Sequence, residues 1–511
     1  MATHFIAIDL VKIYRKAEKK AANLRTVLAW GDEVEVLEST AAHIKIELID
    51  FVEKPDGSIL PVKAEAFIMK PSGGGPALSS IIKPIAAKNV LKVDFVDVQQ
   101  GDGCVIETPK GKVMLIDGGE NQMFARYLAA RYPGSSPEKP KVVDCIIVSH
   151  GDADHFEGLP EILESETNVN PKKRLFMDPK RVYHNGIMKR PGSKPDGTDR
   201  KDIEMLGTTT KVGNQVYLTD LEENLLTVDD SKLNLPFKKW KKTLKEYHDY
   251  YGGTLTFKRL DNSSTNDFNF LAGENINMQV LGPIMEKVNN KPALKFLRQP
   301  AKSVVATDNS GTASGSYSAS HTINGHSVIL RMKYGNVSFM FAGDLNEEAE
   351  DMLVASANAG TLDVQSEILK VPHHGSADFS NDFFEVVKPL VSVVSSGDEN
   401  EAKEYIHPRA TLMGALGKHS RINRPLIFVT ELVAFFKTEG WAKSTKKETA
   451  NKPNTEFFAF SRSAYGIVHV RTDGKKILVF THSGQKDLKE AYSFMIANDG
   501  DEPARQDVIM A

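Results

Sequence analysis

The chain has 511 residues, about three times the length of a typical domain, so more than one folded unit is expected. Its composition is 41% hydrophobic, 26% charged and 8% aromatic, which excludes a disordered or fibrous protein. The 64 Lys and Arg residues nearly balance the 67 Asp and Glu residues and leave a net charge of −3. A chain-wide electrostatic affinity for nucleic acid is therefore also excluded.

The sequence predicts neither a targeting signal nor a membrane span. The N-terminus lacks the apolar region and the cleavage site of a secretory signal, and no stretch approaches the ~18 consecutive apolar residues of a membrane span. Cys104 and Cys145 each lie in an apolar run, which predicts two packed thiols rather than a disulfide. We therefore expect a cytoplasmic protein without a membrane partner.

Residues 1–70 are predicted to form a small β-rich module. A helical pattern at residues 8–21 comes first, and charged residues then alternate with apolar ones at 34–36 and 44–48. A turn at Pro55–Gly57 leads into another apolar run. The alternation predicts a compact antiparallel sheet that resembles a β-barrel of the Src-homology type. Such a module is a candidate binding site for a protein partner.

Changes in composition divide the rest of the chain. Residues 71–89 begin with a Pro-Ser-Gly-Gly-Gly-Pro run, which predicts a linker that lets the N-terminal module move. Residues 90–485 combine helical patterns with continuous apolar runs, typical of an α/β domain whose strands are buried on both faces. Residues 165–325 are basic and rich in Pro and Gly, which predicts a large insertion in that domain. Residues 486–511 are expected to form a C-terminal tail.

Metal-binding side chains gather directly after one apolar strand. The run VVDCIIVSH ends at His150, and Asp152, Asp154 and His155 follow, so four such side chains lie within six residues. Imidazole nitrogens and carboxylate oxygens are the ligands of hydrolytic metal sites. A solvated polar loop is the alternative, because Asp, His and Gly are common in loops. Clustered carboxylates are costly without a neutralising cation, so the pattern favours a metal site.

Three further strand ends carry residues of the same kinds. Asp344 follows the run NVSFMFAG and precedes a helix, where it could equally be a helix cap. His373 and His374 follow the run SEILKVP; because adjacent side chains point in different directions, one is expected to bind metal and the other to hold substrate or donate a proton. His407 follows another apolar strand and a polar segment.

In this order, the motifs resemble those of the metallo-β-lactamase superfamily and, within it, the nuclease-type domains of ComEC-like competence proteins. The resemblance covers about residues 90–165 and 325–480. Its motifs are DVQQGD, LIDGG, SHGDADHFEGL, SVILRMKYG, FAGDL, LKVPHHGS, the dipeptide His407-Pro408 and VRTDG. The resemblance implies an α/β fold with four layers, an αββα sandwich, and two metal ions at the strand ends between its sheets.

The resemblance also implies the metal ligands. His150 and Asp152 would hold one ion, Asp154 and His155 would hold the other, and Asp344 would bridge them or complete the second site. Asp154 is thereby also a catalytic candidate.

Four more residues receive roles from the same resemblance. Asp117 of LIDGG would fix the ligand loop through hydrogen bonds. His373 would complete a metal site. His374 and His407 would lie near the substrate as catalytic residues.

The sequence departs from the superfamily pattern in three respects. Asp152 replaces the usual second histidine, and this oxygen ligand favours harder ions such as Mn²⁺ over Zn²⁺. A separate histidine that many relatives place between the two halves has no clear equivalent. ComEC proteins also carry a membrane channel that this sequence lacks, so their DNA-uptake role does not transfer. By position alone, the candidates for the missing histidine are His184, His248, His321 and His326.

The chemistry expected of such a site is hydrolysis. Two divalent cations, Zn²⁺ or Mn²⁺, lower the pKa of a bound water and stabilise charge that develops on a phosphodiester. We therefore predict a phosphodiesterase, most simply a nuclease acting on nucleic acid or another phosphodiester. The alternatives are a hydrolase of small esters, lactones or cyclic nucleotides, and a non-catalytic binding scaffold. Four lysines around Trp240 could follow a phosphate backbone or form a solvated face: Lys238, Lys239, Lys241 and Lys242.

Overall fold

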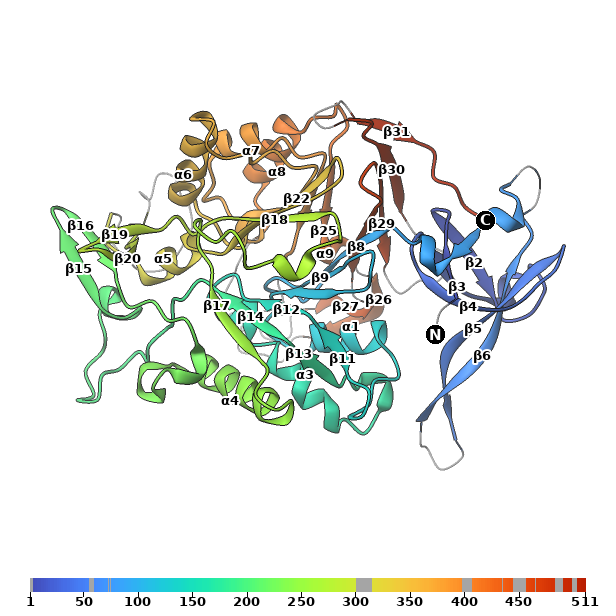
Figure 1. Cartoon of the computed structure of the whole chain (residues 1–511), viewed down its shortest axis with the longest axis horizontal. Helices are drawn as coiled ribbons and strands as arrows, with labels where there is room; N and C mark the ends of the chain where they lie inside the picture. The colour runs from blue at the N-terminus through green and yellow to red at the C-terminus, as the bar shows by residue number, and fades with distance from the viewer. Residues whose placement is uncertain are drawn as a thin grey trace.

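A computed structural model of the chain describes residues 3–54, 59–71, 73, 75–299, 315–397, 407–433, 435–443, 456–464, 466–482, 490–498 and 503–511. Two large sheets form the centre of the molecule (Figure 1). The larger has ten described strands, in the order β17 (Thr256–Arg259), β14 (Arg181–His184), β12 (Cys145–Ile147), β10 (Val113–Ile116), β9 (Cys104–Glu107), β8 (Leu91–Val96), β28 (Ile467–Thr472), β29 (Lys476–His482), β30 (Ala491–Met495) and β31 (Ala504–Gln506). The smaller has six, in the order β18 (Ile276–Gly282), β21 (Ile329–Tyr334), β22 (Val337–Phe341), β23 (Ile368–Lys370), β24 (Val391–Val394) and β25 (Leu426–Val429).

The two sheets pack against each other through one apolar cluster. Val93 and Phe95 of β8 belong to the same buried cluster as Phe339 and Phe341 of β22. The rings of Phe95 and Phe341 lie 6.2 Å apart. Every residue of β8, β9 and β10 is buried, so the prediction of strands covered on both faces is confirmed.

Helices cover the outer face of each sheet (Figure 1). Leu128 of α1 and Trp240 of α4 belong to the apolar cluster under the ten-stranded sheet. Leu353 of α6, Phe383 of α7 and Leu412 of α8 belong to the cluster over the six-stranded sheet. The protein is therefore of the mixed α/β class, as predicted. The described helices are α1 (Met123–Arg131), α2 (Ala153–Phe156), α3 (Pro160–Glu164), α4 (Leu235–Tyr250), α5 (Ala319–Gly325), α6 (Glu347–Asn358), α7 (Asn381–Val387), α8 (Ala410–His419) and α9 (Thr430–Val433).

The segment predicted as an insertion contributes strands to both central sheets. β14 and β17 extend the ten-stranded sheet, and β18 pairs with β21 at the edge of the six-stranded sheet. Residues 165–325 thus contribute strands to the two central sheets as well as to smaller sheets beside them. The remaining small sheets are β11 (Lys141–Val143) with β13 (Met177–Pro179), β15 (Thr209–Val212) with β16 (Gln215–Leu218), β20 (Lys291–Lys295) and β19 (Glu286–Val288), and β26 (Phe435–Lys443) with β27 (Glu456–Ala464).

The N-terminal region forms a separate antiparallel sheet. The helix predicted at residues 8–21 is wrong, because the backbone of Leu10–Tyr14 pairs as strand β2. Leu10, Val11 and Ile13 are fully buried, and β-branched residues such as Val11 and Ile13 suit a strand. The order of its seven described strands is β3 (Leu24–Ala29), β2 (Leu10–Tyr14), β6 (Ile59–Met69), β5 (His43–Glu53), β4 (Glu33–Ser39), β1 (His4–Ile6) and β7 (Ile82–Pro84).

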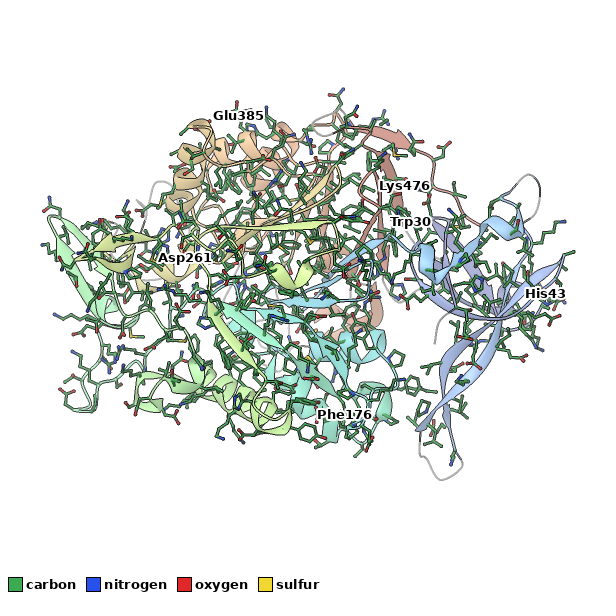
Figure 2. The ribbon with its side chains drawn as sticks, viewed as in Figure 1. Trp30, His43, Phe176, Asp261, Glu385 and Lys476 are labelled. Atoms are coloured by element: carbon green, nitrogen blue, oxygen red, sulfur yellow. The ribbon has the colours of Figure 1, made fainter. Side chains whose placement is uncertain are left out.

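This sheet docks on the rest of the molecule. Its strand β7 comes from residues 71–89, the segment predicted as a linker. Trp30 belongs to a buried cluster with Leu478 and Phe480 of β29, and the Lys476 ammonium lies 5.4 Å from the Trp30 ring (Figure 2). Ala511 adds backbone hydrogen bonds to β2, 2.8 Å from Lys12 N to Ala511 O. These contacts oppose the free movement that the glycine-rich run predicted.

Two predictions about single features can be compared with the structure. Cys104 and Cys145 are buried free thiols, which confirms the prediction for both. Within the described ranges, every helix is too short or too polar to cross a membrane.

Candidate metal centre

The candidate ligands lie in loops at the ends of neighbouring strands. β10 and β12 pair in parallel in one sheet, and β22 and β23 pair in parallel in the facing sheet. Parallel neighbours end at the same edge of a sheet, so the loops that follow them meet. The loops after β12, β22 and β23 therefore come together, although more than 200 positions separate the first residue from the last. They carry His150 to His155, Asp344, and His373 with His374.

Four of these side chains form one cluster. One potential ligand atom from each of Asp154, His155, Asp344 and His374 lies within 4.8 Å of the others. Asp344 is central, because its two carboxylate oxygens lie 3.2 Å from His155 Nε2 and 3.2 Å from His374 Nε2. His374 Nε2 is also 3.3 Å from Asp154 Oδ2.

Several polar atoms of this cluster make no hydrogen bond within the described structure. They are buried, and they include His155 Nε2, His374 Nε2 and Asp344 Oδ1. Leaving one buried polar atom unsatisfied costs about 1–3 kcal/mol. Imidazole nitrogens and carboxylate oxygens that converge in this way fit a divalent cation, whose binding would satisfy them together.

Asp117 orients one of the candidate ligands. Its carboxylate accepts hydrogen bonds from Ser149 N and Ser149 Oγ, both at 2.7 Å, and from His155 Nδ1 at 2.9 Å. Because a carboxylate only accepts here, Nδ1 of His155 carries a proton, and Nε2 is the ring nitrogen directed towards the cluster. A carboxylate that holds a ligating histidine in this way is common at metal sites.

The two adjacent histidines lie in different positions relative to the cluster. His374 is buried, donates from Nδ1 to Ser395 O at 2.9 Å and directs Nε2 into the cluster. His373 lies at the rim, with its side chain 26% exposed and Nε2 4.0 Å from Asp344. The positive φ angles of both residues, 46° and 51°, turn the two rings apart. Of the two adjacent histidines, His374 and not His373 is therefore one of the four residues of the cluster.

His150 and Asp152 stand beside the cluster. His150 Nε2 is 4.0 Å from Asp344 Oδ2, and its Nδ1 lies 3.1 Å from Ser149 Oγ. The Asp152 carboxylate forms an ion pair with the Lys189 ammonium. With its amide nitrogen turned towards this carboxylate, Asn324 of α5 donates to Asp152 Oδ2 at 3.0 Å.

Burial and charge set the protonation of the cluster. Burial lowers the pKa of the His155 and His374 imidazoles, but nearby carboxylates, Asp344 foremost, outweigh burial and raise each pKa well above its usual value. Burial raises the pKa of Asp154 and Asp344, but the same two imidazoles outweigh it and lower both. Burial and then His155 lower the pKa of His150 to about 4, so its imidazole is neutral at pH 7.

His407 lies next to the cluster. Its ring centroid is 6.0 Å from that of His373. Burial, followed by the charges of His373 and His374, lowers the pKa of His407 to about 3. An imidazole that is neutral at pH 7 is a poor proton donor, so this environment disfavours His407 as the general acid.

The sequence analysis missed two charged residues of the centre. Asp102 follows β8 and lies 3.4 Å from His374 Nδ1. Lys370, the last residue of β23, pairs with Asp102, and its Nζ donates to Gly343 O at 3.0 Å and lies 3.9 Å from Asp344 Oδ1. Both belong to motifs that carried the family resemblance, and a lysine at the end of a wholly apolar strand was a further signal.

The four histidines considered for the missing position lie outside the cluster within the residues that the structure describes. His326 Nε2 donates to Lys295 O at 2.7 Å, and His321 lies 3.5 Å from Asp378. His248 lies beside Asp249 on the surface of α4. His184 accepts a hydrogen bond from Gly186 N at 3.0 Å.

The lysines of α4 form a charged surface with acidic partners. Nζ of Lys239 is 2.8 Å from Glu161, and Nζ of Lys241 is 2.6 Å from Asp230. Lys242 lies 3.8 Å from Glu246 one turn along the helix. Trp240 is buried in the core beneath the ten-stranded sheet, so it offers no exposed ring on which a base could stack.

Comparisons with known proteins agree with this geometry. Residues 96–202 match the metallo-beta-lactamase superfamily. The match indicates a metal-dependent hydrolase and confirms the resemblance seen in the motifs. It includes Asp102, Asp117, His150, Asp154 and His155, whereas Asp344 and His374 lie beyond it.

Two curated proteins are similar to part of the chain. ComE operon protein 3 of Bacillus subtilis (strain 168) is 30% identical over 99 residues, which are 19% of this chain and 12% of that protein. Competence protein ComA of Neisseria gonorrhoeae is 32% identical over 97 residues, 19% of this chain and 13% of that protein. The aligned part of the chain thus spans about an eighth of the length of either relative.

Proposed function

We propose that the protein is a metal-dependent phosphodiesterase, with nucleic acid as its preferred substrate. The observation that carries this proposal is the convergence of Asp154, His155, Asp344 and His374 with buried atoms that lack hydrogen bonds. The partial similarity to competence proteins favours nucleic acid over other phosphodiesters. We further infer that the two sheets and their helices form the αββα sandwich of the superfamily, with the centre at one edge.

The roles of the residues follow from their positions. Asp154, His155, Asp344 and His374 would hold a divalent ion, Zn²⁺ or Mn²⁺. When bound, the ion supplies a Lewis acid for a phosphoryl oxygen and lowers the pKa of a water molecule. Asp117 keeps the proton of His155 on Nδ1.

Two further residues have proposed roles in hydrolysis, one in balancing charge and one in proton transfer. The buried Lys370 ammonium offsets part of the negative charge of Asp102 and Asp344. His373, partly exposed at the rim, presents an imidazole that can transfer a proton to the leaving oxygen.

One observation favours a second candidate, a hydrolase of small esters, lactones or cyclic nucleotides. Three of the four lysines proposed to contact nucleic acid already pair with acidic side chains. A surface whose charges are locally neutralised attracts a polyanion less strongly than free lysines would. A small substrate needs no such surface.

A substrate panel tests the proposal. Protein stripped of metal and reloaded with Mn²⁺, Zn²⁺ or Mg²⁺ is assayed with single- and double-stranded DNA, RNA, bis(4-nitrophenyl) phosphate, a cyclic dinucleotide, a carboxylic ester and a lactone. Asp154→Ala is the control for metal-dependent activity. We expect metal-dependent cleavage of the nucleic acids and of the artificial phosphodiester, both lost in the control. Turnover of the ester or lactone alone would replace the proposal by the second candidate, and metal binding without any turnover would favour a scaffold.

A further inference from the structure

The Asp152 carboxylate, expected to bind a second metal ion, already has partners on both oxygens. The Lys189 ammonium pairs with Oδ1, and the Asn324 amide donates to Oδ2 at 3.0 Å when its nitrogen is turned towards Asp152, the orientation that satisfies both groups. Lys189 follows β14, and Asn324 lies on α5, so two different segments direct donors at one carboxylate. The side chains of Asp152 and Lys189 are only 18% and 25% exposed, which shields this ion pair from solvent.

The remaining side chains do not gather into a second group of ligands. With Asp152 engaged, the donors left are His150 Nε2 and His373 Nε2, each 4.0 Å from the same Asp344 oxygen, and among the described residues these three do not form a group of ligand atoms within 4.8 Å of one another. That Asp344 oxygen also faces His374 at 3.2 Å. A zinc site normally takes at least three ligands from the protein. The other group of potential ligands in the described part of the chain, Asp102, Asp117 and His155, shares His155 with the four-residue cluster.

We propose that the centre holds one tightly bound metal ion, and that the Lys189 ammonium takes the place of the second. Asp154, His155, Asp344 and His374 bind the ion, whereas Lys189 and Asn324 occupy the Asp152 carboxylate. This inference rests on the metal centre of the proposed function but not on its phosphodiester substrate.

An ammonium group in this position can supply part of the electrostatic stabilisation that a second metal ion would provide. It carries a positive charge beside Asp152, which lies two positions after His150 in the same loop. Its three N–H groups can donate to an anionic oxygen of a substrate as well as to Asp152. Because a quarter of the side chain is exposed, such an oxygen can reach it. Lys189 thereby becomes a candidate substrate-positioning residue.

Metal stoichiometry tests the inference independently of activity. Purified full-length protein is dialysed against excess Mn²⁺, passed through a desalting column and measured by elemental analysis, and titrations by calorimetry follow each binding event. We expect one Mn²⁺ per chain and the electron paramagnetic resonance spectrum of an isolated ion. Two tightly bound ions with a spin-coupled spectrum would overturn the inference, whereas no bound metal would refute the metal centre itself.

Variants test the assignment to Lys189. Lys189→Met removes the ammonium at nearly constant length and releases Asp152, so we expect a second, weaker binding event alongside an unchanged first one. Lys194→Gln is the matched control, because Lys194 lies in the same segment and its Nζ pairs with Glu204 at 2.9 Å. It should bind one ion like the unmodified protein. A Lys189→Met variant that still binds only one ion would overturn the assignment of the second position to Lys189.

Discussion

Two buried clusters of charged residues lie in this molecule, and they differ in what faces the carboxylates. Asp94 on β8 is fully buried, and its two oxygens lie 2.6 Å from Arg471 Nη1, 2.7 Å from His469 Nδ1, 2.8 Å from the Tyr127 hydroxyl and 3.2 Å from Arg131 Nε. In the metal centre, by contrast, Asp344 faces two imidazoles, and its Oδ1 makes no hydrogen bond.

The difference separates a structural cluster from a candidate metal centre. Arginine never loses its proton in a protein, so Asp94 has permanent counter-ions that also satisfy its hydrogen bonds. An imidazole can lose its proton and become a ligand, so the Asp344 cluster can exchange protons for a metal ion. Buried charge by itself therefore does not indicate a binding site. The type of the counter-group distinguishes the two clusters, because buried atoms without hydrogen bonds also occur beside Asp94, at Arg131 Nε and Arg471 Nε.

Asp344→Asn should produce the largest effect on activity. The amide replaces the carboxylate that faces both His155 and His374, so the ion loses its central ligand. Even loss of a residue that merely orients a ligand costs about 10–100-fold, so we expect hydrolysis to fall by more than about 100-fold. Metal content and steady-state rates are the measurements. Retention of a full metal equivalent would show that Asp344 is not a ligand.

Asp94→Asn should affect stability instead. It leaves the Arg471 guanidinium buried without its carboxylate and leaves Arg131 with Glu107 alone, and breaking a buried pair in this way costs about 3–5 kcal/mol. Urea unfolding measures the loss, and metal analysis of the folded variant should still give the unmodified content. A variant that unfolds normally but has lost its metal would contradict the separation of the two clusters.

The pH dependence of stability should follow the structural cluster. Burial raises the pKa of both Asp94 and Glu107. The positive charges of Arg131 and Arg471 outweigh burial at Asp94, and those of Lys92 and Arg131 outweigh it at Glu107, so both pKa values lie below their usual range. The unfolded chain therefore takes up these protons first, at a pH near the ordinary value of about 4. The stabilisation is complete above that pH and is lost as the pH falls towards the folded-state pKa values.

Urea midpoints of metal-free protein at pH 7, 5, 4 and 3 measure this loss. Asp94→Asn should lose less stability than the unmodified protein between pH 5 and 3. An identical pH profile in the variant would show that Asp94 does not cause the acid sensitivity.

Asp117→Asn should have an intermediate effect on metal binding. The amide cannot accept all three hydrogen bonds that hold Ser149 and His155, so His155 loses its fixed tautomer. We expect about 10–100-fold weaker metal binding, measured by calorimetry. Asp144→Asn is the matched control, because Asp144 accepts a backbone hydrogen bond from Val113 N at 2.9 Å outside the centre. Equal weakening in both variants would indicate a general structural effect.

The α4 lysines should give the smallest effect. Replacing Lys238, Lys239, Lys241 and Lys242 with Gln breaks exposed ion pairs, which are worth about 0–1 kcal/mol each. If they contact nucleic acid, DNA cleavage should weaken modestly at low salt, and the loss should shrink as salt rises. Hydrolysis of bis(4-nitrophenyl) phosphate should not change. Equal losses with both substrates would assign the lysines a structural role.

Local sequence identified the loop that runs from His150 to His155 and the second loop at Asp344, because ligand types concentrated after apolar strands are visible without a structure. It also identified the α/β class, since strands buried on both faces appear in the sequence as continuous apolar runs. It failed at residues 8–21, where helical spacing was present but pairing with β3 buried Leu10 and Val11 in a strand. Tertiary pairing outweighs a local periodicity of that length.

The sequence by itself determined which chemical groups are available to the metal centre, because these lie in short motifs. Only the tertiary structure decided how they are used. It placed His374 rather than His373 in the cluster, brought Lys370 to Asp102, and directed Lys189 at Asp152. The physical reason is that a side chain's role depends on backbone direction and on partners distant in sequence. Neither a positive φ angle in one loop nor an ion pair between two segments is encoded in local spacing.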